Sequence, residues 1–302
     1  MSELVLRALR EGEVDLFESL PDPGLVGLAA FGQRYGTMAQ EGEYRPEWTW
    51  VALREGRVVA RAAWWGGPSD DAPRTLDWLD FTDPDAAVAL LRAAPFRAEY
   101  SLTVPVDWRD HPEVRTAAQD RADVARRCGM RLLVERLQYV WTPSAGVPDR
   151  PGRLRLRAEP EDAAILDALR RIFVDALDAG IRRDVERLGA AGAAVEELAF
   201  LKWLPGPREW WRLAYAPSGD LAGLVVPSRN YAGPQVGFVG VVPQQRGNGY
   251  GYELLVECTH LLVAAGAERI TATTDTTNVP MAAAFATAGY PVTRHRMLLG
   301  YP

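Results

Sequence analysis

The hydrophobic pattern at the start of the chain returns after its middle. Leu4–Ala8 forms a short strand-like stretch before an acidic segment, and Leu154–Ala158 does the same. Further along each half, two apolar stretches are separated by a short turn, at Glu55-Gly56 in the first half and at Pro217–Asp220 in the second. Alternation with a period of two predicts half-buried strands, and the turns predict hairpins.

The two halves also close in the same way. Each ends in a helical pattern, a glycine (Gly129 or Gly289) and an alternating strand. Between them, Thr142–Gly152 is rich in Pro, Gly and Ser, which is typical of a linker. Two unrelated α/β domains would share some of these features by chance, but the matching order of three elements favours an internal duplication. We expect domains at 1–143 and 153–302, joined by a linker at 144–152.

The second half contains helices that alternate with strands after a run of three strands. The pattern predicts strands at 153–157, 209–216, 221–228, 235–242, 269–275 and 291–299, and helices at 160–178, 194–203, 249–265 and 279–288. Residues 179–193 read as a mobile stretch. This order predicts an α/β fold (a mixed α+β sheet) in each half, with helices on the sheet faces.

Composition narrows the class of protein. The 302 residues are 48% hydrophobic and 25% charged, and the net charge is −6. An acidic balance argues against a nucleic-acid partner. No apolar run would span a bilayer, and the first residues lack the pattern of a signal peptide, so we expect neither membrane association nor export. Two distant cysteines fit a reducing cytoplasm, and the three histidines show no metal-ligand spacing, so we expect no metal.

A glycine-rich turn carries the most chemical information. An apolar strand ends at Val241-Val242-Pro243, and Arg246-Gly247-Asn248-Gly249-Tyr250-Gly251 leads into a helix. Glycines at the start of a helix leave backbone N–H groups uncovered at the positive end of its dipole, which suits a phosphate. The spacing is neither that of a dinucleotide-binding fold nor that of a Walker loop. Alone, the turn would also fit a tight strand-to-helix connection.

Two signatures together resemble a known family. Arg246-x-x-Gly249-x-Gly251 is similar to the acyl-CoA motif of the GNAT superfamily of N-acetyltransferases, and the preceding Val-x-Pro strand end matches as well. The segment from Asn278 to Tyr290 resembles the second signature of the same superfamily, in the right order. The duplicated layout resembles tandem members such as mycothiol synthase, with a degenerate N-terminal domain.

The resemblance implies an acetyl-CoA site in the second half. The strand backbone around Val239 to Val242 would pair with the pantetheine arm, the N–H groups of the loop would hold the pyrophosphate, and Asn278 would lie near the pantetheine path. The implied cofactor-binding residues are Val239, Val241, Val242, Arg246, Gly247, Asn248, Gly249, Tyr250, Gly251 and Asn278. The implied reaction is direct attack by an amine on the thioester, which needs a base for the amine and an acid for the thiolate.

The catalytic residues are less determined. Phe285 stands where the superfamily usually has a tyrosine acid, and phenylalanine has no proton to donate. The alternatives are Tyr290, Tyr252 or water, although Tyr290 also reads as a core residue. Asp275, at the end of a strand, is the candidate base, and a turn or helix cap is its alternative reading.

Other side chains near the expected cleft have simple structural readings. Glu196 and Glu197 would be weaker bases or part of a solvated helix face. Arg182 and Arg183 would meet an anionic substrate or remain in water. Three tryptophans would line an acceptor pocket or pack in the core: Trp203, Trp210 and Trp211.

The first half lacks the loop. Its corresponding region, Asp77–Asp85, carries aspartates that would repel a pyrophosphate. We therefore expect one acetyl-CoA site per chain and a primary amine of a small molecule as acceptor. A protein or peptide amine, a longer acyl group, and a non-catalytic acyl-CoA sensor or scaffold remain open alternatives.

Overall fold

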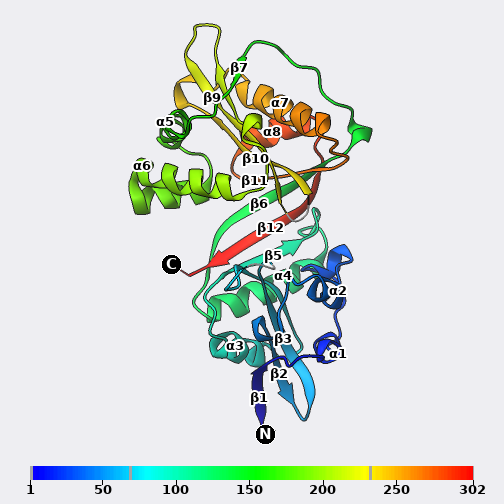
Figure 1. Ribbon diagram of the computed structural model, residues 1–302. Coiled ribbons are helices and arrows are strands. Elements are labelled where there is room, and N and C mark those ends of the chain that lie inside the picture. The colour runs from blue at the N-terminus through cyan, green and yellow to red at the C-terminus, as the bar shows by residue number, and fades with distance from the viewer. Residues whose placement is uncertain (1–2, 68–69, 231–232, 302) are drawn as a thin grey trace. The chain divides into compact units, whose positions relative to one another are not determined.

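The computed structural model describes residues 3–67, 70–230 and 233–301. The chain forms two compact units, Met1–Arg136 with Arg294–Pro302, and Leu137–Thr293. Each is a mixed sheet with helices on both faces, so the predicted fold class is confirmed (Figure 1). No helix in the described ranges combines the length and the apolar character needed to cross a bilayer.

The first unit is built on strands in the order β1-β2-β3-β4-β5-β12. Its strands are β1 (Leu4–Ala8), β2 (Thr49–Arg54), β3 (Arg57–Trp65), β4 (Thr75–Phe81), β5 (Glu99–Val104) and the end of β12 (Val292–Gly300). Its helices are α1 (Val14–Glu18), α2 (Tyr35–Gln40), α3 (Pro84–Ala93) and α4 (Pro112–Arg127). The predicted hairpin between β2 and β3 is confirmed, with Glu55 and Gly56 both at positive φ as in a type I′ turn.

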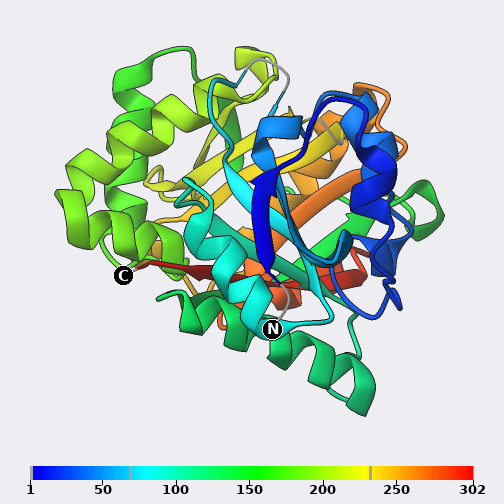
Figure 2. The same ribbon diagram turned by 90° about the horizontal axis from the view of Figure 1, so that it is seen from below.

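Alternation along the strands divides the core of the first unit between the two faces of its sheet. On one face, Ala52 and Trp64 join a cluster formed with α3 and α4, which includes Leu90. On the other face, Val51 packs with Phe17 of α1 and with residues of α2. Figure 2 shows α1 and α2 in blue and α3 and α4 in cyan to green.

The second unit is built on strands in the order β6-β11-β10-β9-β8-β7. Its strands are the end of β6 (Arg131–Trp141), β7 (Arg155–Ala158), β8 (Arg212–Tyr215), β9 (Leu221–Asn230), β10 (Gly233–Val241) and β11 (Ile270–Asp275). Its helices are α5 (Asp162–Phe173), α6 (Ala179–Trp203), α7 (Tyr250–Ala264) and α8 (Val279–Thr287). Short 3-10 turns lie at Pro143–Ala145, Arg208–Trp210 and Pro243–Gln245.

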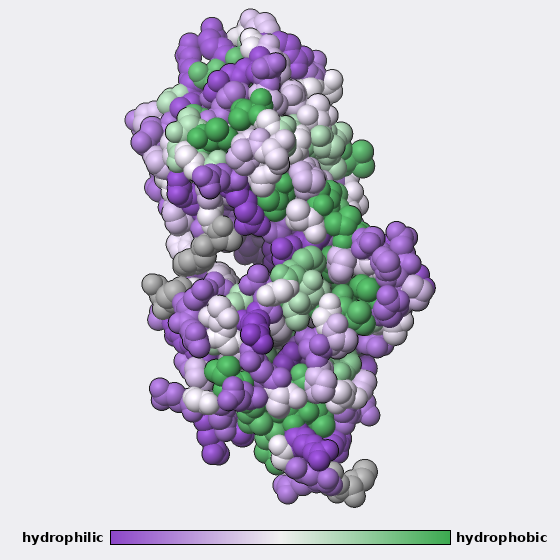
Figure 3. Space-filling view, turned by 90° about the vertical axis from the view of Figure 1, so that its right-hand side faces the viewer, coloured by the Kyte–Doolittle hydropathy of each residue, from purple (hydrophilic) through white to green (hydrophobic). Residues whose placement is uncertain are grey.

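The second unit repeats the two-sided core. Leu169 of α5 and Leu198 of α6 pack with Leu224 on one sheet face. Leu254 of α7 and Phe285 of α8 pack with other strand residues on the opposite face. Polar and apolar side chains are interspersed over the face of the molecule shown in Figure 3.

The prediction of a mobile stretch at 179–193 is wrong, because these residues form the first part of α6. The Asp178 side chain caps this helix by accepting the Ile181 N–H, and Ile181 packs against the α5–α6 core. Gly189 has φ of 71° and interrupts the helical geometry, so α6 consists of two helical pieces joined at that glycine. Gly189 therefore marks a kink within a helix.

The strand orders of the two units match element by element, as a duplication would give. The last strand of each series comes from the other half of the sequence, since β12 lies beside β5 and β6 lies beside β11. Antiparallel pairing of β12 with β5, from His295↔Val104 to Leu299↔Tyr100, explains why residues 294–302 belong to the first unit. The domain boundaries that the sequence suggests, at residues 143 and 153, stay a prediction.

Candidate functional site

The strand β10 offers a free backbone edge. It pairs antiparallel with β9 along its length, but among the described residues its parallel register with β11 is confined to Gln235↔Thr271. The register with β9 shifts between Val236 and Phe238, so Gly237 is the extra residue of a bulge. A Cβ at Gly237 would lie 2.7 Å from the Val226 oxygen, which explains the glycine. The edge from the bulge to Val241 is thus open to an extended ligand.

The glycine loop leaves a cluster of backbone donors at the start of α7. Gly247 and Gly249 have φ of 82° and 76°, and Gly249 is the N-cap without any side-chain cap. Within the described residues, the backbone N–H groups from Gly247 to Gly251 donate to no acceptor of the protein. Arg246 differs, since its N–H donates to the Pro243 oxygen. Five adjacent N–H groups at a helix N-terminus can hold a phosphate.

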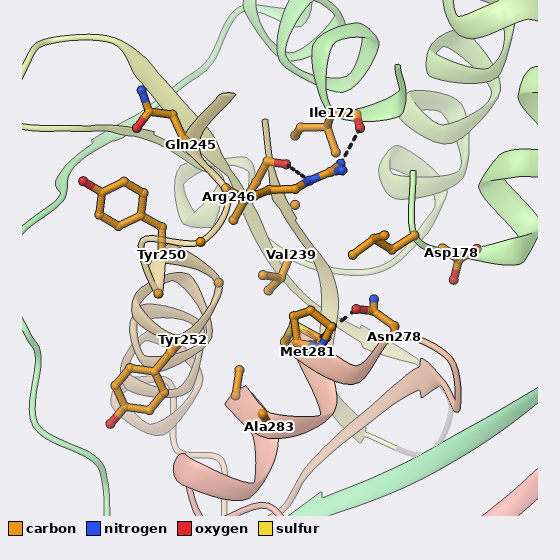
Figure 4. Close-up of a pocket in the computed structure, with 18 of the residues that line it drawn as sticks. Ile172, Asp178, Val239, Gln245, Arg246, Tyr250, Tyr252, Asn278, Met281 and Ala283 are labelled. Atoms are coloured by element: carbon orange, nitrogen blue, oxygen red, sulfur yellow. Dashed lines mark hydrogen bonds between the residues drawn. The ribbon is translucent and has the colours of Figure 1, made fainter. Parts of the chain in front are cut away.

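The Arg246 side chain holds the loop in place. Its Nη1 donates to the Asp175 oxygen at 2.6 Å, and its Nε and Nη2 reach the Val241 and Ile172 oxygens (Figure 4). The guanidinium therefore ties the loop to the C-terminal end of α5. The sequence motif identified Arg246 but not this role.

A cavity of about 600 Å³ lies against the loop and the β10 edge. Apolar side chains from α5, α6, β10 and α8 form much of its wall, among them Ile181 of α6. Figure 4 shows Ile172, Val239 and Met281 from the other three elements. Val239, Val241, Arg246, Gly247, Gly249, Tyr250, Gly251 and Asn278 all line it, whereas Asn248 and Val242 do not. Val242 is fully buried and packs in the α5–α6 core.

Asn278 and Gly251 face this cavity in ways that suit a ligand. Asn278 is the N-cap of α8, and its Oδ1 accepts the Met281 N–H at 3.3 Å, which orients the amide beside the cavity. A Cβ at Gly251 would meet only Val241, at 4.0 Å, so the protein itself leaves room there. Donors, an open strand edge and this room together fit the pyrophosphate and pantetheine arm of CoA.

Of the candidate catalytic residues, Tyr252 lines this cavity, whereas Asp275 and Tyr290 lie outside its lining (Figure 4). Asp275 is fully buried, and its Oδ2 accepts the Ala179 N–H at 2.6 Å at the start of α6. The Tyr290 hydroxyl lies 2.7 Å from Thr259 Oγ1, and burial raises the pKa of Tyr290. Phe285 is buried and stacks on Tyr139, with ring centroids 4.3 Å apart. The structure does not bring these three side chains to the cavity wall.

The remaining candidate residues from the sequence analysis lie outside the cavity lining. Arg182 donates to the Leu177 oxygen at 2.7 Å, and Glu196 pairs with Arg187 at 2.7 Å on the exposed side of α6. Trp211 is buried in the α5–α6 core and Trp203 is exposed. Arg183, Glu197 and Trp210, like these four, are outside the cavity lining.

Two charged residues that the sequence analysis did not identify also line the cavity. Asp178 is the N-cap of α6, and its Oδ1 accepts the Ile181 N–H at 2.9 Å. Arg153 comes from the segment before β7 and reaches the start of α7, where its Nη2 lies 2.6 Å from Glu253 Oε1. An Asp before a helix was a visible capping signal, but Arg153 had none, because the contact joins residues far apart in sequence.

The first unit treats the corresponding helix start differently. Where β4 leads into α3, the Asp83 carboxylate accepts the N–H groups of Asp85 and Ala86, each at 3.0 Å. Arg54 pairs with the same carboxylate at 2.9 Å. The chain's own side chain thus takes the donors that the second unit leaves to a ligand.

The comparison with protein families agrees with this geometry. The acetyltransferase (GNAT) family matches residues 179–290. Residues 179–290 are a GNAT acetyltransferase domain. Membership implies acyl-CoA-dependent acetyl transfer, and the matched residues contain the open β10 edge, the glycine loop and Asn278. No curated protein matches the chain in sequence.

Solved structures extend the likeness beyond the GNAT domain. A GCN5-related N-acetyltransferase from Sphaerobacter thermophilus superposes with a TM-score of 0.57 at 13% identity, covering 98% of this chain and 94% of its own. A glucosamine N-acetyltransferase region of a fungal multi-domain GH3 β-N-acetylglucosaminidase gives 0.54 at 13% identity, covering 99% of this chain and 38% of its own. Identities this low show the fold alone.

Proposed function

We propose that this chain is an acetyl-CoA-dependent N-acetyltransferase that acts on a primary amine of a small molecule. The observation that carries the proposal is the run of free N–H groups from Gly247 to Gly251, which opens onto a cavity beside the unpaired edge of β10. That edge is backbone with hydrogen-bonding capacity, and pantetheine is an extended chain with two amides. The arrangement supports CoA more than a nucleotide without such an arm.

The chain's residues would hold the co-substrate in three parts. The N–H groups of Gly247 to Gly251 would bind the pyrophosphate at the start of α7. The backbone of β10 around Val239 and Val241 would pair with the pantetheine amides. Asn278 would contact the arm from the side of α8.

The proposed reaction is direct transfer of the acetyl group from the thioester to the amine. The amine nitrogen bonds to the carbonyl carbon, the carbon–sulfur bond breaks, and CoA leaves as the thiolate. Backbone donors on the free edge of β10 would polarise the carbonyl. We assign Asp275 and Tyr290 positioning roles, because one holds the start of α6 and the other bonds Thr259. Tyr252, which lines the cavity, or water there would protonate the sulfur, and water would carry the amine proton away.

Asp178 gives the cavity a preference for amines. Its carboxylate is the one acidic side chain that lines the cavity among the described residues. This carboxylate would attract an ammonium substrate to the end of the cavity that is remote from the glycine loop. Figure 4 shows Asp178 on the opposite side of the cavity from Gln245, the residue that precedes the loop. Neutralisation of that ammonium then yields the nucleophile.

Calorimetric titration with acetyl-CoA tests the co-substrate, and a panel of amines with thiol release as the readout tests transfer. We expect binding in the micromolar to sub-millimolar range and release of free CoA with at least one amine. No binding at millimolar acetyl-CoA would overturn the proposal. Basic peptides in the same panel test the alternative of a protein N-acetyltransferase.

A non-catalytic acyl-CoA sensor or scaffold is the second candidate. It is favoured by Phe285, which is buried where the superfamily usually has its acid, and by the position of Asp275 away from the cavity lining. Acetyl-CoA binding without transfer to any amine would support it. Transfer to any member of the panel excludes it.

The thiols bear on where the protein works. Cys128 and Cys258 are both free, and burial raises the pKa of the Cys258 thiol. We infer that the chain functions in a reducing cytoplasm, where unpaired thiols persist.

A further inference from the structure

We propose that Arg153 is a phosphate-binding residue of the CoA site, brought there by the segment that joins the two halves of the sequence. The inference rests on the proposed function, since it concerns the phosphates of the same co-substrate. It adds a cation that lies outside both family signatures.

Arg153 is fixed beside the start of α7 by contacts with one carboxylate. The backbone N–H groups of Arg153 and Leu154 lie 3.1 and 3.3 Å from Glu253 Oε2. The Arg153 guanidinium pairs with the other oxygen of the same carboxylate at 2.6 Å and lies 5.3 Å from the Tyr250 ring centroid. Main chain and side chain are therefore both held, which sets the position of the guanidinium.

The guanidinium faces the place where a phosphate would sit. Its side chain is half-exposed and lines the cavity together with Gly249 and Gly251. Its Nη2 lies 3.3 Å from the position that a Cβ on Gly249 would occupy. A guanidinium carries five N–H donors in a planar fork, and Glu253 does not use them all. The remaining donors lie next to the free N–H groups of the loop.

The charges at this place require such a cation. Glu253 is buried in the first turn of α7, close to the N–H groups that would receive an anion. An uncompensated carboxylate there would repel a diphosphate. The ion pair with Arg153 cancels that charge, so Arg153 both contacts the phosphate and shields it from Glu253.

The joining segment is held to α7 at further points, and these supply a control. Arg150 pairs with Glu257 at 2.8 Å, and the Pro148 oxygen lies 2.9 Å from His260 Nε2. Glu253, Glu257 and His260 are spaced so that they lie on one face of α7. Arg150 therefore anchors the segment as Arg153 does, but it is not among the residues that line the cavity.

The test compares Arg153→Met with Arg150→Met and uses calorimetry with CoA, 3′-dephospho-CoA and S-acetylpantetheine. We expect R153M to weaken CoA binding about tenfold or more, because charge-assisted contacts to phosphate are strong. We expect R150M to stay within about threefold of the wild type. S-acetylpantetheine, which has no phosphate, should bind both variants as it binds the wild type.

The ligand set also shows which phosphate is contacted. A tenfold loss that persists with 3′-dephospho-CoA assigns Arg153 to the diphosphate, and a loss seen only with CoA assigns it to the 3′-phosphate. Either supports the proposal. Two further variants isolate the charge effect: Arg153→Lys should bind CoA with intermediate affinity, and Glu253→Gln in the R153M background should recover part of the loss.

Three results would overturn the inference while leaving the proposed function intact. They are unchanged CoA binding by R153M, an equal loss in R150M, and an equal loss of S-acetylpantetheine binding. Failure of the wild type to bind CoA at all would instead count against the proposed function. Melting temperatures separate a binding defect from misfolding, and R153K provides the readout if R153M does not fold.

Discussion

The Nη1 atom of Arg246 lies 2.6 Å from the backbone oxygen of Asp175, just beyond the end of α5. The guanidinium of the glycine motif's arginine is thus bonded to chain carbonyl oxygens, although Arg246 also lines the cavity. Because the C-terminal carbonyls of a helix are favourable partners for a cation, this contact stabilises both the helix end and the loop.

Replacement of this arginine should loosen the loop. We expect Arg246→Met to lower the free energy of unfolding by about 1–2 kcal/mol, since several side-chain to backbone bonds are lost. Acetyl-CoA affinity should fall as well, because the donors must be ordered again on binding. Thermal unfolding and calorimetry measure the two effects. Arg171→Met on the exposed side of α5 is the control and should change neither. Unchanged stability in R246M would contradict the anchoring role.

A glutamate at Gly251 should block the site without harming the fold. Gly251 has room around its Cβ position, so the new side chain would extend into the cavity, where its charge would oppose the pyrophosphate. We expect Gly251→Glu to weaken acetyl-CoA binding at least about 100-fold, with a melting temperature close to that of the wild type. Ala264→Glu, at the exposed end of the same helix, should bind normally. Normal binding by G251E would move the pyrophosphate away from this loop.

The sequence predicted the parts of the site that depend on local pattern. A strand that ends in Val-x-Pro, glycines at a helix start and an Asn before a helix are all signals within a few residues. The fold class and the hairpin at Glu55-Gly56 were predictable for the same reason. Arg153 was not, because its position depends on a contact with Glu253, which lies 100 residues further along.

Two other differences have physical causes that a pattern does not reveal. Residues 179–193 were expected to be mobile, but the cap at Asp178 and packing of Ile181 stabilise a helix there. The last strand was assigned to the second half by chain order, whereas strand pairing places its end beside β5. Pairing between distant segments is decided by the whole sheet and leaves no local signal.

Removal of the Tyr290 hydroxyl distinguishes a structural role for this residue from a role as the catalytic acid. Tyr290→Phe loses the bond to Thr259 and should reduce stability by about 1 kcal/mol. The rate of acetyl transfer should stay within about threefold, because the hydroxyl does not reach the cavity lining. Thr259→Val removes the same bond from the other side and should give a matching loss. A fall in kcat of about 100-fold in Y290F alone would show that Tyr290 supplies a proton after all.

The Asp178 carboxylate should affect the acceptor more than the co-substrate. We expect Asp178→Asn to raise the KM for the amine several-fold and to leave the acetyl-CoA Kd unchanged. Asn can still cap α6, so stability should change by less than about 1 kcal/mol. Asp167→Asn, exposed on α5, is the control. An unchanged amine KM in D178N would place the acceptor elsewhere.

Asp77 should make the stability of the first unit depend on pH. Burial raises the pKa of Asp77 to about 7, although Tyr44 donates to its Oδ1 at 2.8 Å and Arg296 favours its ionised form. A raised carboxyl pKa means that the folded state holds a proton that the unfolded state has lost, so the contribution is complete below about pH 4 and disappears as pH rises through 7. The neighbouring Glu43 also opposes ionisation.

Asp77→Asn tests this linkage, because the amide oxygen can still accept from Tyr44 but cannot ionise. Between pH 4 and 8, the wild type should lose roughly 1–3 kcal/mol of stability relative to D77N. Chemical denaturation at several pH values gives the difference, and Asp71→Asn at an exposed position should run parallel to the wild type. Parallel curves for D77N and the wild type would show that Asp77 ionises in the folded state as easily as in water.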